Sequence, residues 1–143
     1  MIFRLVYASR VSPTAALRLP ETVSDVLASS QRNNALLKVS GLLLVHQGWF
    51  LQALEGGENV VRVLYRRIAE DRRHSECTVL ASENAPERLF GQWSMCARNL
   101  SPTDEAIVKT LALRGDFDAR RLGAKPAVAL LKAVRDIQDR RAA

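Results

Sequence analysis

The chain has 143 residues, of which 48% are apolar and 25% charged, a composition typical of one compact domain. No run of eighteen apolar residues occurs and the N-terminus lacks a secretory signal pattern, so we expect a cytoplasmic protein with no membrane contact. The net charge of +6 contains no run of five like charges, which argues against a nucleic-acid partner.

The N-terminal third predicts one strand and one helix. Residues Ile2 to Ser9 alternate with period two, as a strand does. Pro20 and Glu21 then open a segment whose apolar residues recur at helical spacing, and this helix is predicted to end near Asn33-Asn34.

A hairpin and a second helix are predicted next. Leu37 to Val45 and Trp49 to Glu55 have strand character, and the turn residues Gln47-Gly48 separate them. Apolar residues at helical spacing predict a helix from about Glu58 to Asp71, with Arg62, Arg66 and Glu70 on its outer side.

Two further strands are predicted over Cys77 to Ala81 and Trp93 to Ala97. This order predicts an α+β, ferredoxin-like βαββαββ fold, with a mixed five-stranded sheet and two helices on one face. Both faces of the strands are apolar, so the other face needs a cover as well. Residues 102–141 show two helical patterns and are predicted to form a helical hairpin there. The chain therefore divides into a domain over residues 1–98 and C-terminal capping helices over residues 99–143.

Conventional catalytic and metal-binding motifs are absent from the sequence. The glycine-rich phosphate-binding patterns and the serine-hydrolase pattern do not occur, and the two histidines share no metal-ligand spacing with Cys77 or Cys96. We expect both cysteines to be reduced core residues. The segment Asp71-Arg72-Arg73-His74 is interpreted as a charged helix end, with a ligand site as the alternative.

Polar residues on predicted core faces are the informative feature. Tyr7 is in phase with Phe3 and Leu5, and Gln52 is in phase with Phe50 and Leu54. A buried amide must be hydrogen-bonded, so two interpretations remain open: a Tyr–Gln bond within the core, or a pocket for a planar ligand. Further residues that could line such a pocket are Asn33, Asn34, Trp93 and Met95.

Several segments together resemble the BLUF family, the sensors of blue light using FAD. The resemblance covers about residues 2–98 in order and spacing. The segments that carry it are Tyr7-Ala8-Ser9, Ser29 to Asn34, Val39 to Leu43, Phe50 to Gly56, Asp71 to His74 and Trp93-Ser94-Met95.

The resemblance implies a non-covalently bound FAD whose ring lies between the first two predicted helices. Tyr7 is similar to the family's photoactive tyrosine, and Gln52 to the glutamine that bridges it to the flavin. Asn33 and Asn34 match amides at the flavin edge. The other implied cofactor-binding residues are Arg67, Asp71, Arg73, His74 and Met95. Trp93 and Met95 resemble the residues of the fifth strand that relay the signal.

Under this interpretation the protein is a photoreceptor without enzymatic activity or a metal. The 45 residues after Arg98 are too few for an enzyme domain, so a homodimer or higher homo-oligomer that signals to a separate protein partner is expected. Two alternatives stay open at this point. An RNA-binding module of the RRM type has the same order of elements, and a small flavin redox enzyme could use the same pocket.

Overall fold

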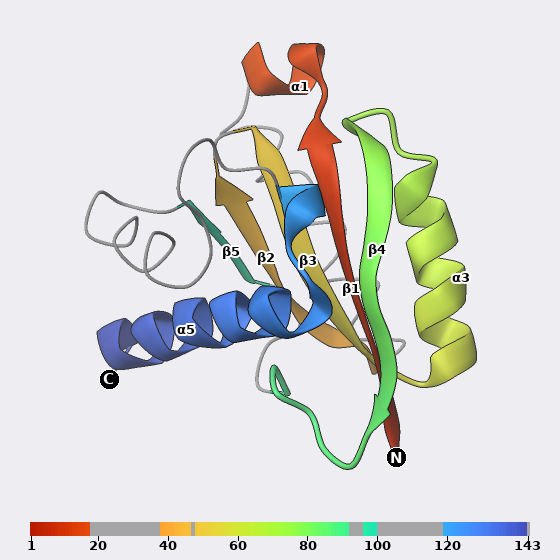
Figure 1. Ribbon diagram of the computed structural model, residues 1–143, viewed down its shortest axis with the longest axis vertical. Coiled ribbons are helices and arrows are strands. Elements are labelled where there is room, and N and C mark those ends of the chain that lie inside the picture. The colour runs from red at the N-terminus through yellow and green to blue at the C-terminus, as the bar shows by residue number, and fades with distance from the viewer. Residues whose placement is uncertain (18–37, 47, 92–95, 100–118, 143) are drawn as a thin grey trace.

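The computed structural model describes residues 1–17, 38–46, 48–91, 96–99 and 119–142. The strands of the sheet lie in the order β4-β1-β3-β2-β5 (Figure 1). The first four of these are antiparallel to their neighbours, and β5 pairs with β2 in parallel. The elements are β1 (Ile2–Val11), α1 (Pro13–Leu17), β2 (Ser40–His46), β3 (Trp49–Gly56), α3 (Glu58–Ala69), β4 (His74–Ala85), β5 (Cys96–Asn99), a 3-10 turn η1 (Ala119–Arg121) and α5 (Ala124–Ala142).

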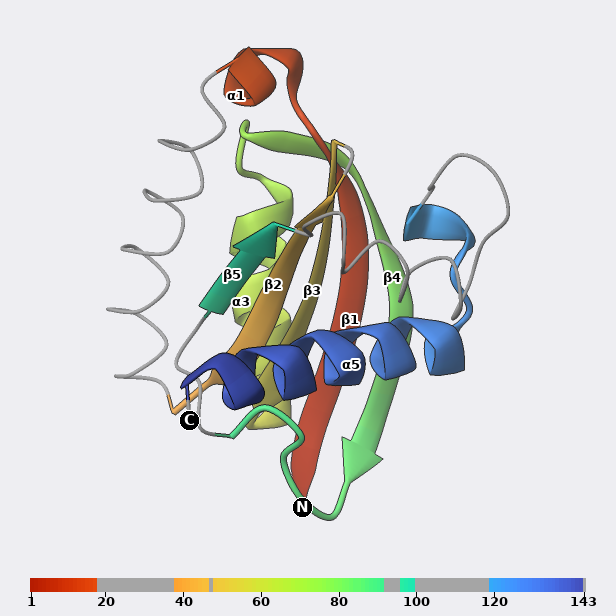
Figure 2. The same cartoon turned by 90° about the vertical axis from the view of Figure 1, so that its left-hand side faces the viewer.

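The predicted α+β class is confirmed, and α3 and α5 cover opposite faces of the sheet (Figure 2). Two predicted helices, over Pro20 to Asn34 and from residue 102, lie outside the described residues, as does most of the strand predicted from Trp93. In the part of the chain that the structure describes, no helix is both long and apolar enough to cross a bilayer.

Each face of the sheet has its own apolar core, as the strand alternation predicts. Adjacent strand residues point to opposite faces, so β1 and β3 contribute to both cores. The core under α3 includes Phe3, Leu5, Tyr7, Phe50, Leu54 and Val61. The core under α5 includes Val6, Ala8, Trp49, Leu51, Leu130 and Leu131.

The predicted fourth strand is too short, and one cysteine prediction is wrong. β4 runs over His74–Ala85 rather than Cys77 to Ala81, because it is an edge strand held by backbone bonds to β1 while many of its side chains face solvent. The Cys77 thiol is free but only partly buried, for the same reason. The side chain of Cys96 lies outside the described part of the structure.

Close approach of backbones at Gly41 sets the β2–β3 hairpin. A Cβ atom at this position would lie 2.0 Å from the carbonyl oxygen of Ala53, so only glycine fits. At the predicted turn, Gly48 has a φ of 82°, and His46 pairs with Trp49 on the two sides. These two glycines therefore fix the register that places Gln52 opposite Leu43.

A buried ion pair joins β1 and β3 on the α5 face. Arg4 Nε donates to a Glu55 carboxylate oxygen at 2.8 Å, and this carboxylate is fully buried. It also accepts bonds from the backbone N–H groups of Leu89 and Phe90 at 2.9 and 2.7 Å. Arg135 of α5 donates to the carbonyl oxygen of Leu89. The segment after β4 is thus bonded both to the sheet and to α5.

A second polar contact fastens η1 to the sheet. The guanidinium groups of Arg10 and Arg120 lie 4.4 and 4.9 Å from the centre of the Trp49 ring. Both also donate to the Glu76 carboxylate, at 2.9 and 3.4 Å. Glu76 itself has a φ of 55° at an irregularity in the β1–β4 pairing. Side chains from three strands and η1 are therefore joined at one end of the sheet.

Candidate functional site

A buried tyrosine and glutamine face each other across two strands. Tyr7 of β1 and Gln52 of β3 are register partners, and their side chains are 2% and 3% exposed. The Tyr7 hydroxyl donates a hydrogen bond to Gln52 Oε1. The predicted convergence of these two groups on the face under α3 is confirmed, and the Gln52 amide nitrogen forms the donor end of the pair.

The phenol of Tyr7 is kept neutral by its surroundings. Burial raises the pKa of Tyr7 well above 10, and the neighbouring Cys77, Tyr65 and Asp71 add to this shift. The ring of Tyr65, from α3, lies 5.2 Å from the Tyr7 ring with a tilt of 55°. Tyr7 is therefore a hydrogen-bond donor throughout the physiological pH range.

His74 lies beside Tyr7 at the start of β4. Its Nδ1 is 2.7 Å from Ser9 Oγ, and its Nε2 is bonded to the carbonyl oxygen of Ile68 at the end of α3. The ring meets Tyr7 and Phe50 edge-on, with centroids 6.3 and 5.9 Å apart. His74 thus lies inside the protein, whereas the sequence alone could not distinguish it from the two arginines before it, Arg72 and Arg73.

Asp71 and Arg73 form a local ion pair after α3. The Arg73 Nε lies 2.9 Å from Asp71 Oδ1, which also accepts the Arg73 backbone N–H at 2.9 Å. Hydrogen bonds from Arg73 hold the pKa of the Asp71 carboxyl below its usual value, against the opposing effect of burial. Arg67 is exposed on α3. These three predicted binding residues lie along the C-terminal half of α3 and the turn that follows it.

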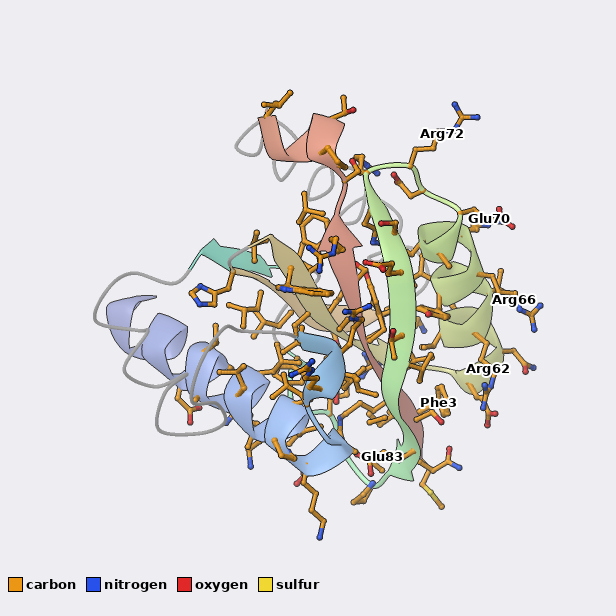
Figure 3. The ribbon with its side chains drawn as sticks, turned by 45° about the horizontal axis from the view of Figure 1, so that its top comes forward. Phe3, Arg62, Arg66, Glu70, Arg72 and Glu83 are labelled. Carbon is orange, nitrogen blue, oxygen red and sulfur yellow. The ribbon has the colours of Figure 1, made fainter. Side chains whose placement is uncertain are left out.

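Other charged residues point away from this site. Figure 3 shows Arg62, Arg66, Glu70 and Arg72 directed outward from α3 and the following turn, as the helical pattern predicts for the first three. Arg62 lies over Phe3 of β1, with its guanidinium carbon 4.6 Å from the centre of the Phe3 ring. The positive charge on this side therefore belongs to the outer surface.

Four predicted site residues, Asn33, Asn34, Trp93 and Met95, lie outside the described residues. The structure adds two neighbours of Tyr7 that the sequence analysis missed, Ser9 and Tyr65. A signal for each was present: Ser9 is in phase with Tyr7, and Tyr65 lies one helical turn after the buried Val61.

The residues present fit a planar, polar-edged cofactor. Tyr65 of α3 packs against the Tyr7 ring, and Phe50 of β3 packs against His74 beside it, so a flat ring system next to the Tyr7–Gln52 pair would meet aromatic walls and a hydrogen-bonding amide. The described residues contain no group of three or more side chains suited to a metal ion. Because α3 and α5 cover both sheet faces, Tyr7 is not on an open RNA-binding surface, and the RRM alternative is not supported.

Comparison with known proteins agrees with this geometry. Residues 2–96 match the family model described as sensors of blue-light using FAD. The chain is 32% identical over 95 residues to the blue light- and temperature-regulated antirepressor BluF of Escherichia coli, covering 66% of this chain and 23% of that protein. It is 33% identical over 109 residues to the photoactivated adenylate cyclase subunit alpha-like protein FB of Euglena gracilis, covering 76% and 11%. The chain thus spans less than a quarter of these curated relatives.

Solved structures give matches over nearly the whole chain. The photo-activated state of BlsA is similar with a TM-score of 0.84 and 26% identity, covering 93% of this chain and 94% of that one. The dark state of BlrB, a BLUF protein, has a TM-score of 0.71 and 26% identity, with 96% of both chains covered. The similarity therefore extends past the region of the family model into the C-terminal residues.

Proposed function

Because the chain belongs to the BLUF family of sensors of blue light using FAD, we propose that Tyr7 and Gln52 are the residues through which absorbed light changes its structure. The chain is a blue-light photoreceptor with FAD as its cofactor. The observation that carries the proposal is the buried hydrogen bond from the Tyr7 hydroxyl to Gln52 Oε1.

The cofactor ring is proposed to lie beside the Tyr7–Gln52 pair, between α3 and the helix predicted over Pro20 to Asn34. The Gln52 amide nitrogen would then donate to the ring, with Asn33 and Asn34 at the same edge. Arg67, Asp71 and Arg73 are proposed for the side nearer the C-terminal end of α3, where Asp71 and Arg73 form an ion pair and Arg67 is exposed.

Tyr7 is proposed as the electron and proton donor. When bound, FAD supplies an excited state that is a strong oxidant. The neutral phenol would give one electron to this oxidant and pass its proton along the hydrogen bond to Gln52, and both would later return to Tyr7. Because the phenol is buried with Gln52 as a hydrogen-bond partner, the proton has a defined path.

Gln52 is proposed as the switch. An amide has a donor end and an acceptor end, so rotation exchanges the end that meets Tyr7, and tautomerisation turns the oxygen that meets Tyr7 from an acceptor into a donor. Each arrangement can be fully hydrogen-bonded, and a buried polar network with two satisfied states is bistable. A changed hydrogen bond from Gln52 to bound FAD would shift the absorption of the cofactor to the red with no net change in its redox state.

The output is proposed to leave through residues 99–143 toward a separate protein partner, with Trp93 and Met95 as relay residues and with self-association of the chain. Leu130, Leu131 and Val134 of α5 are fully buried against the sheet. This packing supports the proposal that a structural change in the sheet is passed to α5. Light-dependent change in the hydrogen exchange of residues 102–141, or in the self-association of the chain, is expected. If neither changes, this route of output is wrong.

This region is a photoreceptor and not an enzyme. A bacterial light-regulated adenylyl cyclase is matched over only 33% of its chain, whereas BlsA and BlrB are matched over 94% and 96%. A flavin enzyme would in addition need a substrate-side acid or base. Bleaching by a nicotinamide donor followed by turnover would favour that alternative.

The test is an absorption spectrum recorded in the dark and directly after a blue flash. A yellow protein whose flavin bands shift slightly to the red and relax in darkness supports the proposal. A protein that takes up no FAD, or whose bound FAD shows no such shift, contradicts it.

A further inference from the structure

His74 is held by hydrogen bonds at both ring nitrogens. The carbonyl oxygen of Ile68 can only accept, so Nε2 must carry the hydrogen. In the neutral ring Nδ1 is then an acceptor, and the Ser9 hydroxyl, 2.7 Å away, donates to it. One neutral tautomer satisfies both partners, and neither ring nitrogen is left to bind a cofactor oxygen.

These bonds connect three elements around Tyr7. His74 starts β4, Ile68 lies in the last turn of α3, and Ser9 follows Tyr7 on the same face of β1. The imidazole edge meets the Tyr7 ring at 72°, with 6.3 Å between centroids. A ring fixed at both nitrogens therefore forms a rigid wall against the phenol.

The other groups around His74 do not compete for its nitrogens. Cys77 Sγ lies 3.9 to 4.0 Å from the ring nitrogens, at the limit of a sulfur hydrogen bond. Phe50 packs edge-on from β3. The Asp71 carboxylate accepts hydrogen bonds from Arg73. Ser9 and Ile68 are thus the close polar contacts of the ring.

We infer that His74 is a positioning residue that holds Tyr7 in line with Gln52, and that it does not bind FAD directly. This inference rests on the proposed roles of Tyr7 and Gln52. It differs from the expectation, drawn from the sequence, that His74 contacts the cofactor. Its consequence is that a substitution at His74 which removes both hydrogen bonds alters the rate at which the light-induced hydrogen bonds return to the dark arrangement, while FAD stays bound.

Two substitutions separate these roles. His74→Phe keeps a ring beside Tyr7 but removes both hydrogen bonds. His74→Gln keeps one donor for the Ile68 carbonyl and one acceptor for the Ser9 hydroxyl. His46 provides a matched control, because it is also 8% exposed but pairs with Trp49, on the α5 face.

Three properties are measured for the wild type, His74→Phe, His74→Gln and His46→Gln. They are the FAD content after purification, the rate of dark recovery, and the ¹⁵N shifts of the histidine ring nitrogens. The chain has only two histidines, so the control variant assigns the spectrum. The NMR measurement does not depend on the photoreaction and can be made with and without FAD.

We expect His74→Phe to retain FAD and to change the rate of dark recovery roughly tenfold. The recovery rates of His74→Gln and His46→Gln should stay near that of the wild type. The ¹⁵N shifts should show the Nε2–H tautomer for His74.

Three results would overturn the inference: loss of FAD from both His74 variants, an unchanged recovery rate in His74→Phe, or a hydrogen on Nδ1 alone. If His74→Phe does not fold, Ser9→Ala, which removes one bond, must change the recovery rate in its place. A wild type without a photocycle refutes the proposed function instead, and the tautomer still tests the hydrogen bonds of His74.

Discussion

The Tyr7 hydroxyl and Gln52 Oε1 are hydrogen-bonded because their backbones are register partners on neighbouring antiparallel strands. Side chains directly opposite each other on one face of such a pair have Cβ atoms only about 5 Å apart. The contact is therefore fixed by strand register rather than by flexible loops. Any change that shifts β3 against β1 by one residue would turn Gln52 to the face under α5.

Tyr7→Phe is expected to leave FAD bound and to abolish the photocycle. Phenylalanine preserves the aromatic wall but has no hydroxyl, so no proton can pass to Gln52. The measurement is the flash-induced difference spectrum, with the dark spectrum as the control for FAD content. A red shift of normal size and recovery in this variant would remove Tyr7 from its assigned role.

Gln52→Leu is expected to have the same effect by a different route. Leucine keeps an apolar side chain in the core but has no polar end, so the Tyr7 hydroxyl loses its acceptor and no amide can rotate. The difference spectrum again gives the result. Retention of the light-induced shift would show that another group connects Tyr7 to the cofactor, and would refute the switch proposed for Gln52.

The stability of the protein is expected to fall above about pH 10, partly because of Tyr7. Burial raises the pKa of Tyr7 in the folded state, so the unfolded chain releases this proton at a lower pH than the folded one. Below pH 10 both states are protonated and there is no loss. Above it the unfolded state binds fewer protons, and the free energy of unfolding decreases as pH rises.

The measurement is urea unfolding between pH 8 and 11 for the wild type and Tyr7→Phe. The wild type should lose up to about 1.4 kcal/mol more per pH unit than the variant once Tyr7 titrates in the unfolded state. Tyr65→Phe is the control, because the pKa of Tyr65 is also raised by burial but its side chain is only partly buried. Parallel curves for the wild type and Tyr7→Phe would contradict the prediction.

Glu55→Gln is expected to destabilise the fold by about 3 kcal/mol or more. The substitution removes a fully buried charge that holds Arg4, leaving a buried guanidinium with a weaker partner. Glu83→Gln is the matched control, because Glu83 also binds Arg4 but its side chain is 52% exposed. That control should cost about 0–1 kcal/mol. Urea unfolding measures both variants. Equal losses in the free energy of unfolding would mean that burial does not decide how much an ion pair with Arg4 stabilises the fold.

Gly41→Ala is expected to destabilise the β2–β3 pairing by about 3 kcal/mol, because the new methyl group would meet a backbone oxygen that cannot move aside. Gly57→Ala is the comparison, since its Cβ would meet nothing closer than 4.0 Å and should cost under about 1 kcal/mol. Thermal unfolding of both variants measures the difference. Similar melting temperatures for the two would show that the hairpin relaxes around the added methyl group.

Much of the fold could be predicted from local patterns. Period-two alternation placed Tyr7 on the α3 face, and Gln47-Gly48 located the hairpin turn, because each signal depends on neighbouring residues alone. The length of β4 could not be predicted in this way. An edge strand is stabilised by backbone bonds to one neighbour, and these bonds leave no hydrophobic pattern at its ends.

The sequence by itself determined the family, the cofactor and the two polar residues that belong on the α3 face, because these follow from motif order and strand phase. Only the tertiary structure decided which groups meet: that Tyr7 lies opposite Gln52, and that His74 turns inward to bond Ser9 and Ile68. The physical reason is that hydrogen bonds between β1, β4 and the end of α3 depend on sheet register and helix position. Residues 65 positions apart, such as Ser9 and His74, carry no local record of that contact.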